Sequence, residues 1–404
     1  MFTENQIDKL IQPLIDRQQR IEQEIIEIIG KRIADVKEIT PSDVRRLGQM
    51  RRTGADVKAI NKKLSELSRF SERQIKGIIK TAAQDAYEDA KPFYDYRQIT
   101  QIPFDTNKPL QKAIEAAGRV SLGNYSNLSK TTAFLMRDRN NPLIVKVTPA
   151  AKAYREIVDR AVQSSVTGMG SYNTLIIKAI QDLTKRGLTA VEYTTDEGKE
   201  HRIRLDSAVR RNILDGIRDV QQTIQNMTGE EFSADGVELS VHMNSAPDHE
   251  PIQGHQFTNE QFDRCQTGLP FKDVNGIQFA ALDRPIGVWN CRHLAFRIII
   301  GEKTPNYTLA ELEKIKADNA DGITVKNKQG KDEKKSMYWC TQRMRQYETD
   351  IRRAKEGQAM AETAEEEAQA EKFKAEVSKL NNEYKVFCNK CGLKPRFDKT
   401  RIYI

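Results

Sequence analysis

The sequence has none of the long apolar runs that cross a lipid bilayer. Its short apolar runs, such as Ile298 to Ile300, have the length of a strand, whereas a membrane helix needs roughly 20 apolar residues in succession. The first residues also lack the cationic region and the apolar core of a secretion signal. We therefore expect a protein that works in, or is packaged from, a cytoplasm and that makes no contact with a membrane.

Cysteine, proline and glycine are scarce as well. Five Cys, 13 Pro and 22 Gly among 404 residues exclude the collagen-like and disulfide-stapled classes, and the odd number of cysteines favours reduced thiols. Cys388 and Cys391 form a Cys-x-x-Cys pair, which is half of the four-ligand set of a structural zinc site. We interpret both residues as buried or free thiols, and we expect no cofactor.

The motifs of common hydrolytic enzymes are also missing. The chain has no Gly-x-Ser-x-Gly nucleophile turn and no Gly-rich phosphate loop that ends in Gly-Lys-Ser or Gly-Lys-Thr. These absences exclude a serine esterase and a terminase-like ATP motor as far as motifs can exclude them. We therefore predict no catalytic residue and no enzyme activity.

The net charge is small but strongly localised. The chain has 65 basic and 57 acidic residues, a formal net charge of +8, and residues 45 to 80 alone hold eleven basic against three acidic residues, which is the same +8. Such a stretch binds phosphate, binds an acidic protein surface, or is an ordinary solvated helix face. Its one aromatic residue is Phe70, so base stacking is not expected. The candidate DNA-phosphate contacts are Arg45, Arg46, Arg51, Arg52, Lys58, Lys62, Lys63 and Lys80.

Apolar residues at helical spacing dominate the first 91 residues. Ile11, Leu14, Ile21 and Ile25 lie on one face of an expected helix, and residues 44 to 90 continue the same pattern. Pro and Gly punctuate residues 92 to 150. We interpret this second stretch as a connector rather than as a part of the core.

The rest of the chain mixes helices and strands. Helices are expected over residues 152 to 187 and 207 to 227, with a short strand at 189 to 193 between them. Strands dominate from Val237 until Thr308 begins a helix. Residues 336 to 387 predict one long helix with a register shift. Its Ala- and Glu-rich middle, residues 358 to 370, is expected to be a solvated arm or a coiled-coil contact.

Together these patterns predict an α+β fold that is predominantly helical. Amphipathic helices come first, a compact α+β domain follows, and a long helical arm closes the chain. The expected units are residues 1 to 91, an amphipathic helical region with the basic stretch at 45 to 80; residues 92 to 150, the connector; residues 151 to 307, the α+β domain; residues 308 to 387, the long helical arm; and residues 388 to 404, a basic tail that returns to the core.

Four of the five histidines fall within one segment. They are His242, His249, His255 and His293, and Cys265 and Cys291 accompany them. His and Cys side chains are the usual ligands of zinc or iron, so these four histidines are the candidates for a metal. The spacings are poor support for a metal site, because neither a His-x-x-x-His helix pair nor a zinc-protease motif is present. We interpret them as hydrogen-bonded parts of the fold.

Short motifs surround these histidines. They are Val237 to His242, Ala246 to His249, Gln253 to Phe257 and Gly287 to His293, preceded by Arg186 to Leu188 and Ala208 to Arg211. This series resembles the phage minor capsid protein 2 family over about residues 150 to 404, whereas residues 1 to 150 share only the helical character. A looser likeness to the Mu-type head morphogenesis proteins rests on His249, Gly254, Phe257 and Asn290 to Arg292.

The resemblance implies a structural minor capsid protein of a tailed bacteriophage. Such a protein is made in the host cytoplasm, is built into the virion in multiple copies near the portal and the capsid interior, and has the portal protein, the major capsid protein and packaged double-stranded DNA as its partners. The resemblance also implies a set of signature residues that determine the fold. These are His242, Pro247, His249, Gln253, Gly254, Phe257, Gly287, Trp289, Asn290, Cys291, Arg292 and His293.

Two other functions stay open at this point. A metal-dependent hydrolase carried in the particle would use His242, His249, His255 and His293. A coiled-coil adaptor outside any virion would use residues 358 to 370 as its partner contact.

Overall fold

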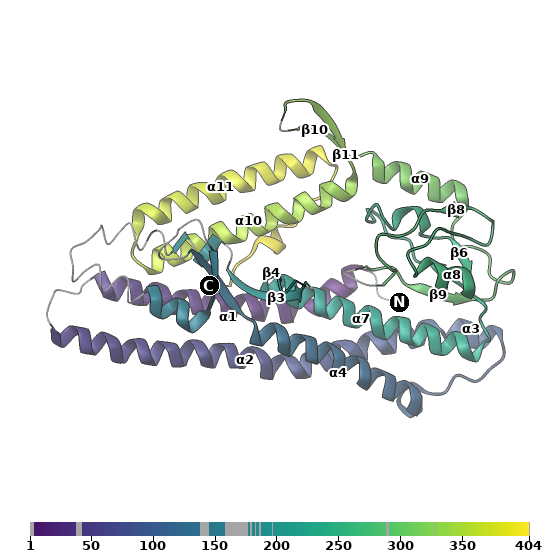
Figure 1. Cartoon of the computed structure of the whole chain (residues 1–404), viewed down its shortest axis with the longest axis horizontal. Helices are drawn as coiled ribbons and strands as arrows, with labels where there is room; N and C mark the ends of the chain where they lie inside the picture. The colour runs from purple at the N-terminus through teal and green to yellow at the C-terminus, as the bar shows by residue number, and fades with distance from the viewer. Residues whose placement is uncertain are drawn as a thin grey trace.

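A computed structural model describes residues 4–37, 43–137, 145–157, 177, 180–181, 183–185, 187–195, 197–287, 291–327 and 329–403. These residues form mostly helices with small antiparallel sheets, which confirms the predicted α+β class. Figure 1 shows the long helices lying along the longest axis of the molecule. Within the described residues, none of the helices combines the length and the apolar character needed to cross a membrane.

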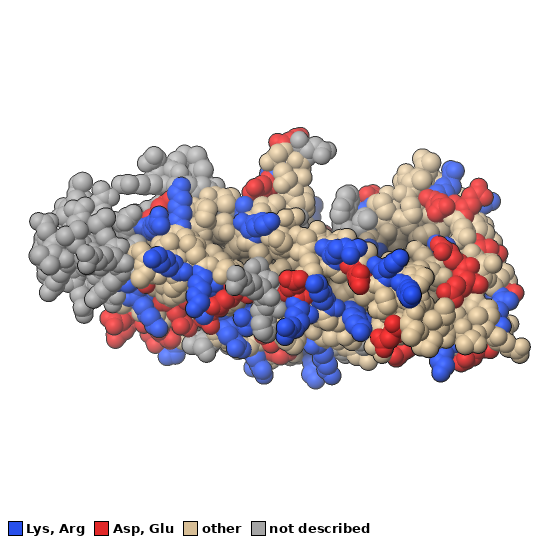
Figure 2. Space-filling view, turned by 90° about the horizontal axis from the view of Figure 1, so that it is seen from below, with Lys and Arg blue, Asp and Glu red and all other residues tan. Residues whose placement is uncertain are grey.

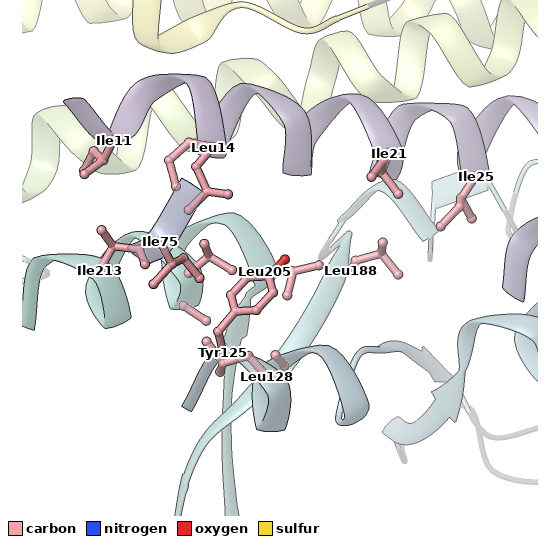
Figure 3. Close-up of a cluster of buried hydrophobic side chains, with 14 of the residues drawn as sticks. Ile11, Leu14, Ile21, Ile25, Ile75, Tyr125, Leu128, Leu188, Leu205 and Ile213 are labelled. Atoms are coloured by element: carbon pink, nitrogen blue, oxygen red, sulfur yellow. The ribbon is translucent and has the colours of Figure 1, made fainter. Parts of the chain in front are cut away.

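Four long helices, which we call the helical body, share the largest core. They are α1 (Glu4–Lys37), α2 (Asp43–Asp89), α4 (Lys108–Lys130) and α7 (Leu205–Glu231). Leu14 and Ile25 of α1 are buried as their spacing predicted, and Figure 3 shows Ile75, Tyr125 and Ile213 of the other three helices in the same cluster. Each such side chain contributes about 1.5 to 3 kcal/mol when it is fully buried, so this cluster holds the four helices together.

The prediction that residues 92 to 150 are a connector outside the core was wrong. After α3 (Lys91–Tyr96) and η1 (Phe104–Thr106), this segment forms α4, and Leu110 and Tyr125 of α4 are buried in the body. The side chain of Asn107 caps α4 by accepting a hydrogen bond from the amide of Leu110 at 3.1 Å. Pro109 lies in the first turn, where its missing N–H removes no hydrogen bond. The proline that suggested a loop instead marks the start of a helix.

A four-stranded antiparallel sheet accompanies the body, with the strand order β2-β1-β3-β4. The strands are β1 (Ala133–Arg137), β2 (Val145–Pro149), β3 (Leu188–Thr194) and β4 (Glu200–Arg204). β3 confirms the strand predicted at residues 189 to 193, and α7 confirms the helix predicted after it. Most of the helix expected over residues 152 to 187 lies outside the described residues.

Residues 236 to 307, which we call the signature unit, pack against the end of α7 (Figure 1). β5 (Gly236–Leu239) pairs in antiparallel fashion with both β6 (Gln256–Thr258) and β9 (Ala295–Ile298). α8 (Asn259–Cys265), β7 (Phe271–Lys272) and β8 (Gln278–Phe279) complete the unit around a small apolar core. Because β5 pairs on both sides, the loop that follows it lies beside the segment that leads into β9.

The single long helix predicted over residues 336 to 387 was also wrong. α10 (Met337–Thr363) ends before Glu365, whose φ of 55° turns the chain, and α11 (Glu367–Lys390) packs alongside α10 (Figure 1). Residues 358 to 370 are not a solvated arm, since Met360 and Ala361 are fully buried in the core that α1 shares. Small alanine side chains allow helices to approach closely, and composition alone does not distinguish such a contact from a solvated face.

Two connections tie the carboxy-terminal helices to the rest of the protein. Two elements lead from the signature unit to α10: α9 (Leu309–Ala320) and the hairpin of β10 (Ile323–Lys326) and β11 (Asp332–Lys335). α9 begins after Thr308 as predicted, and the side chain of Thr308 caps it. After α11, the tail contains η3 (Phe397–Thr400) and returns to α1, where the Nζ atom of Lys399 lies 2.6 Å from the Oε1 atom of Gln12.

Candidate functional site

The structure brings His249, Cys291 and His293 together in the signature unit. His249 precedes η2 (Glu250–Ile252) in the loop after β5, while Cys291 and His293 lie two residues apart in the segment before β9. The Sγ atom of Cys291 is 3.3 Å from Nδ1 of His249 and 3.5 Å from Nδ1 of His293. All three residues are buried. The pairing of β5 with β9 therefore joins groups that are 42 residues apart in the chain.

A backbone carbonyl fixes which nitrogen of His249 faces the thiol. Nε2 of His249 lies 3.0 Å from the carbonyl oxygen of Arg284, a group that can only accept a hydrogen bond. Nε2 therefore carries the proton, and in the neutral ring Nδ1 presents its lone pair to Cys291. The side chain of Arg284 also forms an ion pair with Asp248, the residue before His249, and its Nε atom lies 2.6 Å from Oδ2 of Asp248.

The electrostatics of the cluster favour a thiolate. Burial alone raises the pKa of the Cys291 thiol, but hydrogen bonds from His249 and His293 outweigh burial and lower this pKa to about 5. For His249, burial lowers the pKa, but the contact with Cys291 and the carbonyl of Arg284 raise it above its ordinary value. The two opposite shifts describe a thiolate beside an imidazolium, whose Nδ1 then donates to the sulfur. The thiolate is the state in which cysteine acts as a nucleophile or binds a metal.

His242 borders the cluster, whereas His255 belongs to another part of the unit. The ring of His242 packs edge-on against that of His293, with 4.8 Å between the ring centroids. Nδ1 of His255 instead lies 2.8 Å from a carboxylate oxygen of Asp273. The four histidines named from the sequence thus divide into a group of three and a separate residue that contacts Asp273. Sequence reasoning did not select Cys291 as a partner of His249, and the Cys-x-His spacing before β9 was the available signal.

The other signature residues shape the loop that carries His249. Gln253 accepts a hydrogen bond from the backbone amide of His242 at 2.9 Å and so closes the loop across its base. Gly254 has a φ of +75°, which strains any residue with a side chain. Phe257 is fully buried in the core of the unit and Pro247 is exposed.

The remaining signature residues lie at the approach to β9. Gly287 also has a positive φ, of +89°, and Arg292 is half-buried between Cys291 and His293. Trp289 and Asn290 lie outside the described residues.

A cavity of about 200 Å³ opens beside the cluster. Cys291, His293 and His242 line it on one side, and residues of α10 line it on the other, among them Tyr338 and Arg345. The cluster therefore lies next to a space between the signature unit and the carboxy-terminal helices that is large enough to hold water.

All the basic residues proposed to contact DNA belong to α2. Lys58, Lys62 and Lys80 are exposed, while the Nζ atom of Lys63 lies 2.8 Å from a carboxylate oxygen of Glu24 on α1. The side chains of Arg45, Arg46, Arg51 and Arg52 lie outside the described part of the structure. Figure 2 shows Lys and Arg side chains spread along this face of the molecule, with acidic side chains among them.

The described residues form a body of long helices with a small α+β unit at one end, which is an architecture that carries no catalytic motif in its sequence. The model of the phage minor capsid protein 2 family matches residues 2–389, so the chain belongs to that family. It is a structural protein of the bacteriophage capsid and a component of the virion. The match also covers the amino-terminal helices, where resemblance rested on helical character alone. Neither the curated proteins nor the solved structures include a match to the chain.

Proposed function

We propose that this protein is a non-enzymatic head component of a tailed phage, located at the portal vertex inside the capsid. In this proposal it is assembled in multiple copies in the host cytoplasm, its helical body contacts the portal protein and the major capsid protein, and α2 contacts the phosphates of packaged double-stranded DNA. The family supports the capsid role. The excess of basic residues on α2 is the observation that supports the proposed contact with DNA.

Lys58 and Lys62 are the described residues that support this contact best. Both are exposed on α2 and lie four residues apart, so they lie on the same face of the helix. Lys63 differs from them, because Glu24 and Glu66 both lie within ion-pair distance of its ammonium group. Contacts of this kind are made to phosphate and are independent of base sequence. Each such contact adds about one unit to the slope of the logarithm of the binding constant against the logarithm of the salt concentration.

The test is a titration of duplex DNA against the full-length chain, followed by fluorescence anisotropy at about 50 to about 200 mM salt. We expect binding that weakens steeply with salt. The double variant Lys58→Glu/Lys62→Glu is expected to bind more weakly with a salt slope smaller by about two. The matched control is Lys374→Glu/Lys379→Glu, which makes the same charge change on exposed positions of α11. Equal weakening by both variants, or binding that ignores salt, would contradict the DNA contact.

The location is tested separately on particles. Comparison of images of virions with and without the protein is expected to show the difference in density at the portal vertex. Density spread evenly over the capsid surface would contradict this part of the proposal and leave the capsid role intact.

A further inference from the structure

We propose that the Sγ atom of Cys291, the Nδ1 atom of His249 and the ring of His293 bind one transition-metal ion of the zinc type. The fourth coordination position would face the cavity beside the cluster. The inference is independent of the proposed contacts with DNA and portal, because it concerns the inside of the signature unit.

The spacing of the donor atoms agrees with zinc coordination. Zinc bonds of about 2.3 Å to sulfur and about 2.0 to 2.1 Å to nitrogen, at tetrahedral angles, place a sulfur and a nitrogen ligand about 3.5 Å apart. The observed distances from Sγ of Cys291 to the two Nδ1 atoms are 3.3 and 3.5 Å. The three ligand atoms lie within 4.8 Å of one another, so rotation of the side chains alone can bring them around one ion.

The chemistry of the donors selects the class of metal. One thiolate and two imidazoles suit zinc and its neighbours among the transition metals, whereas magnesium and calcium require oxygen ligands. A set of three protein ligands leaves the fourth position to water or to another donor. The cavity of about 200 Å³ next to Cys291 and His293 has room for such a group.

The surroundings of the two histidines support the assignment. The carbonyl oxygen of Arg284 holds the Nε2 side of His249, which is the usual outer contact of a histidine that binds metal through its other nitrogen. His293 is 95% buried, and its Nε2 atom has no hydrogen-bond partner in the described structure. A buried polar atom left unpaired costs about 1 to 3 kcal/mol. A metal bond to Nε2 would give this atom the partner that it lacks.

Such an ion would crosslink two segments of the signature unit that are otherwise held near each other by the pairing of β5 with β9. The loop after β5 carries His249, and the approach to β9 carries Cys291 and His293. Because ligands rarely gather in an unfolded chain, metal binding would stabilise the folded signature unit directly. The competing arrangement is a metal-free thiolate and imidazolium pair, to which the same two distances also correspond.

The experiment uses the full-length chain, stripped of metal with a chelator, kept reduced and titrated with Co²⁺. Thiolate ligation to cobalt gives a charge-transfer band in the near ultraviolet. We expect this band to saturate at one ion per chain and to disappear when Zn²⁺ displaces Co²⁺. Absence of the band in the wild-type chain would overturn the proposal in favour of the metal-free pair.

Variants assign the site. Cys291→Ser is expected to remove the band, whereas His293→Cys keeps a ligand and is expected to strengthen it. The matched controls are Cys265→Ser, His255→Gln and Cys391→Ser, which alter Cys and His residues outside the cluster and are expected to retain stoichiometric binding. Circular dichroism checks that each variant is folded. A band that persists in Cys291→Ser, or one that is lost in Cys391→Ser, would overturn the assignment.

Discussion

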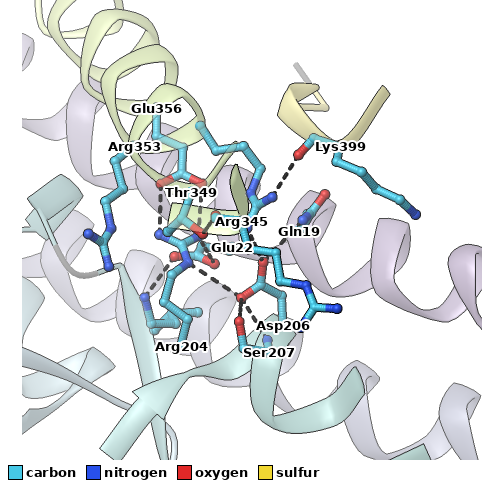
Figure 4. Close-up of polar contacts among 12 residues, drawn as sticks. Gln19, Glu22, Arg204, Asp206, Ser207, Arg345, Thr349, Arg353, Glu356 and Lys399 are labelled. Atoms are coloured by element: carbon cyan, nitrogen blue, oxygen red, sulfur yellow. Dashed lines mark hydrogen bonds and ion pairs between the residues drawn. The ribbon is translucent and has the colours of Figure 1, made fainter. Parts of the chain in front are cut away.

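The guanidinium group of Arg204 meets the carboxylate of Glu356 through two nitrogen atoms, at 2.9 and 3.2 Å. Arg204 ends β4 and Glu356 lies in α10, so this pair fastens the body to the carboxy-terminal helices (Figure 4). Glu22 of α1 and Asp206 of α7 also lie within 3.4 Å of the same guanidinium group. One buried arginine thus holds carboxylates from three helices.

Replacing Arg204 is expected to destabilise the protein severely. Arg204→Met leaves Glu22, Asp206 and Glu356 buried without their shared cation, and removing one partner from a buried ion pair costs about 3 to 5 kcal/mol. Urea denaturation followed by circular dichroism measures the change. The control is Lys316→Met, which breaks an exposed pair with Glu313 and is expected to change stability by less than about 1 kcal/mol. Similar losses in both variants would contradict this account.

The same network predicts a loss of stability at alkaline pH. Burial, together with the neighbouring Glu356 and Asp206 carboxylates, raises the pKa of Glu22 to about 8, although Arg204 opposes the shift. A carboxyl group with a raised pKa binds more protons in the folded than in the unfolded chain. Its contribution to stability is therefore complete below the ordinary pKa of 4.5 and is lost as the pH rises through about 8.

The variant Glu22→Gln isolates this contribution. It is expected to flatten the dependence of the urea midpoint on pH between about pH 5 and about pH 9, because the amide does not ionise. Glu72→Gln, at an exposed position of α2, is the control and is expected to follow the wild type. A Glu22→Gln curve parallel to that of the wild type would show that Glu22 does not titrate in this range.

Gly254 is expected to tolerate alanine less well than a glycine of similar backbone conformation. Gly254 and Gly276 have φ angles of +75° and +81°, so alanine at either position costs about 1 to 2 kcal/mol of backbone strain. At Gly254 the added methyl group would also lie 2.5 Å from a side-chain carbon of Leu312 in α9, whereas Gly276 faces open space. Overpacking adds about 1 to 3 kcal/mol. Unfolding free energies of the two variants measure the difference, and equal values would remove the packing argument.

Tyr384 is expected to hold the carboxy-terminal tail. Its hydroxyl donates to Glu348 at 2.9 Å and accepts from the backbone amide of Arg396 at 2.8 Å. Tyr384→Phe removes both hydrogen bonds at a cost of about 1 to 3 kcal/mol. We expect trypsin to cleave the tail faster in this variant. Tyr347→Phe, in the neighbouring ring, is the control, and unchanged cleavage in Tyr384→Phe would contradict the role of the hydroxyl.

Local patterns predicted the parts of the fold that depend on local physics. The spacing of Leu14 and Ile25 identified the buried face of α1, and Thr308 marked the start of α9. The spacing could not reveal that α10 and α11 are separate helices, because Glu365 turns the chain within a run of good helix formers. Which face of a helix is buried depends on the elements that pack against it, and the sequence of the helix alone does not identify these elements.

The candidate cluster shows the same limit more sharply. The histidines were visible in the sequence, but the partner of His249 is Cys291, which lies beside it only because β5 pairs with β9. His255 looked equivalent to His249 by spacing, yet it faces Asp273 instead. The residue types in the sequence indicated a His and Cys cluster, but the pairing of β5 with β9 determines which of these residues belong to it.

The contact of α1 with α10 can form only late in the synthesis of the chain. About 300 residues separate the two helices, and a ribosome that adds about 5 to 20 residues per second needs about 15 to 60 s to make them. During that interval the isoleucine-rich face of α1 has no Met360 or Ala361 to cover it. Until then, α2, α4 and α7 are the described helices of the same core that can cover this face of α1.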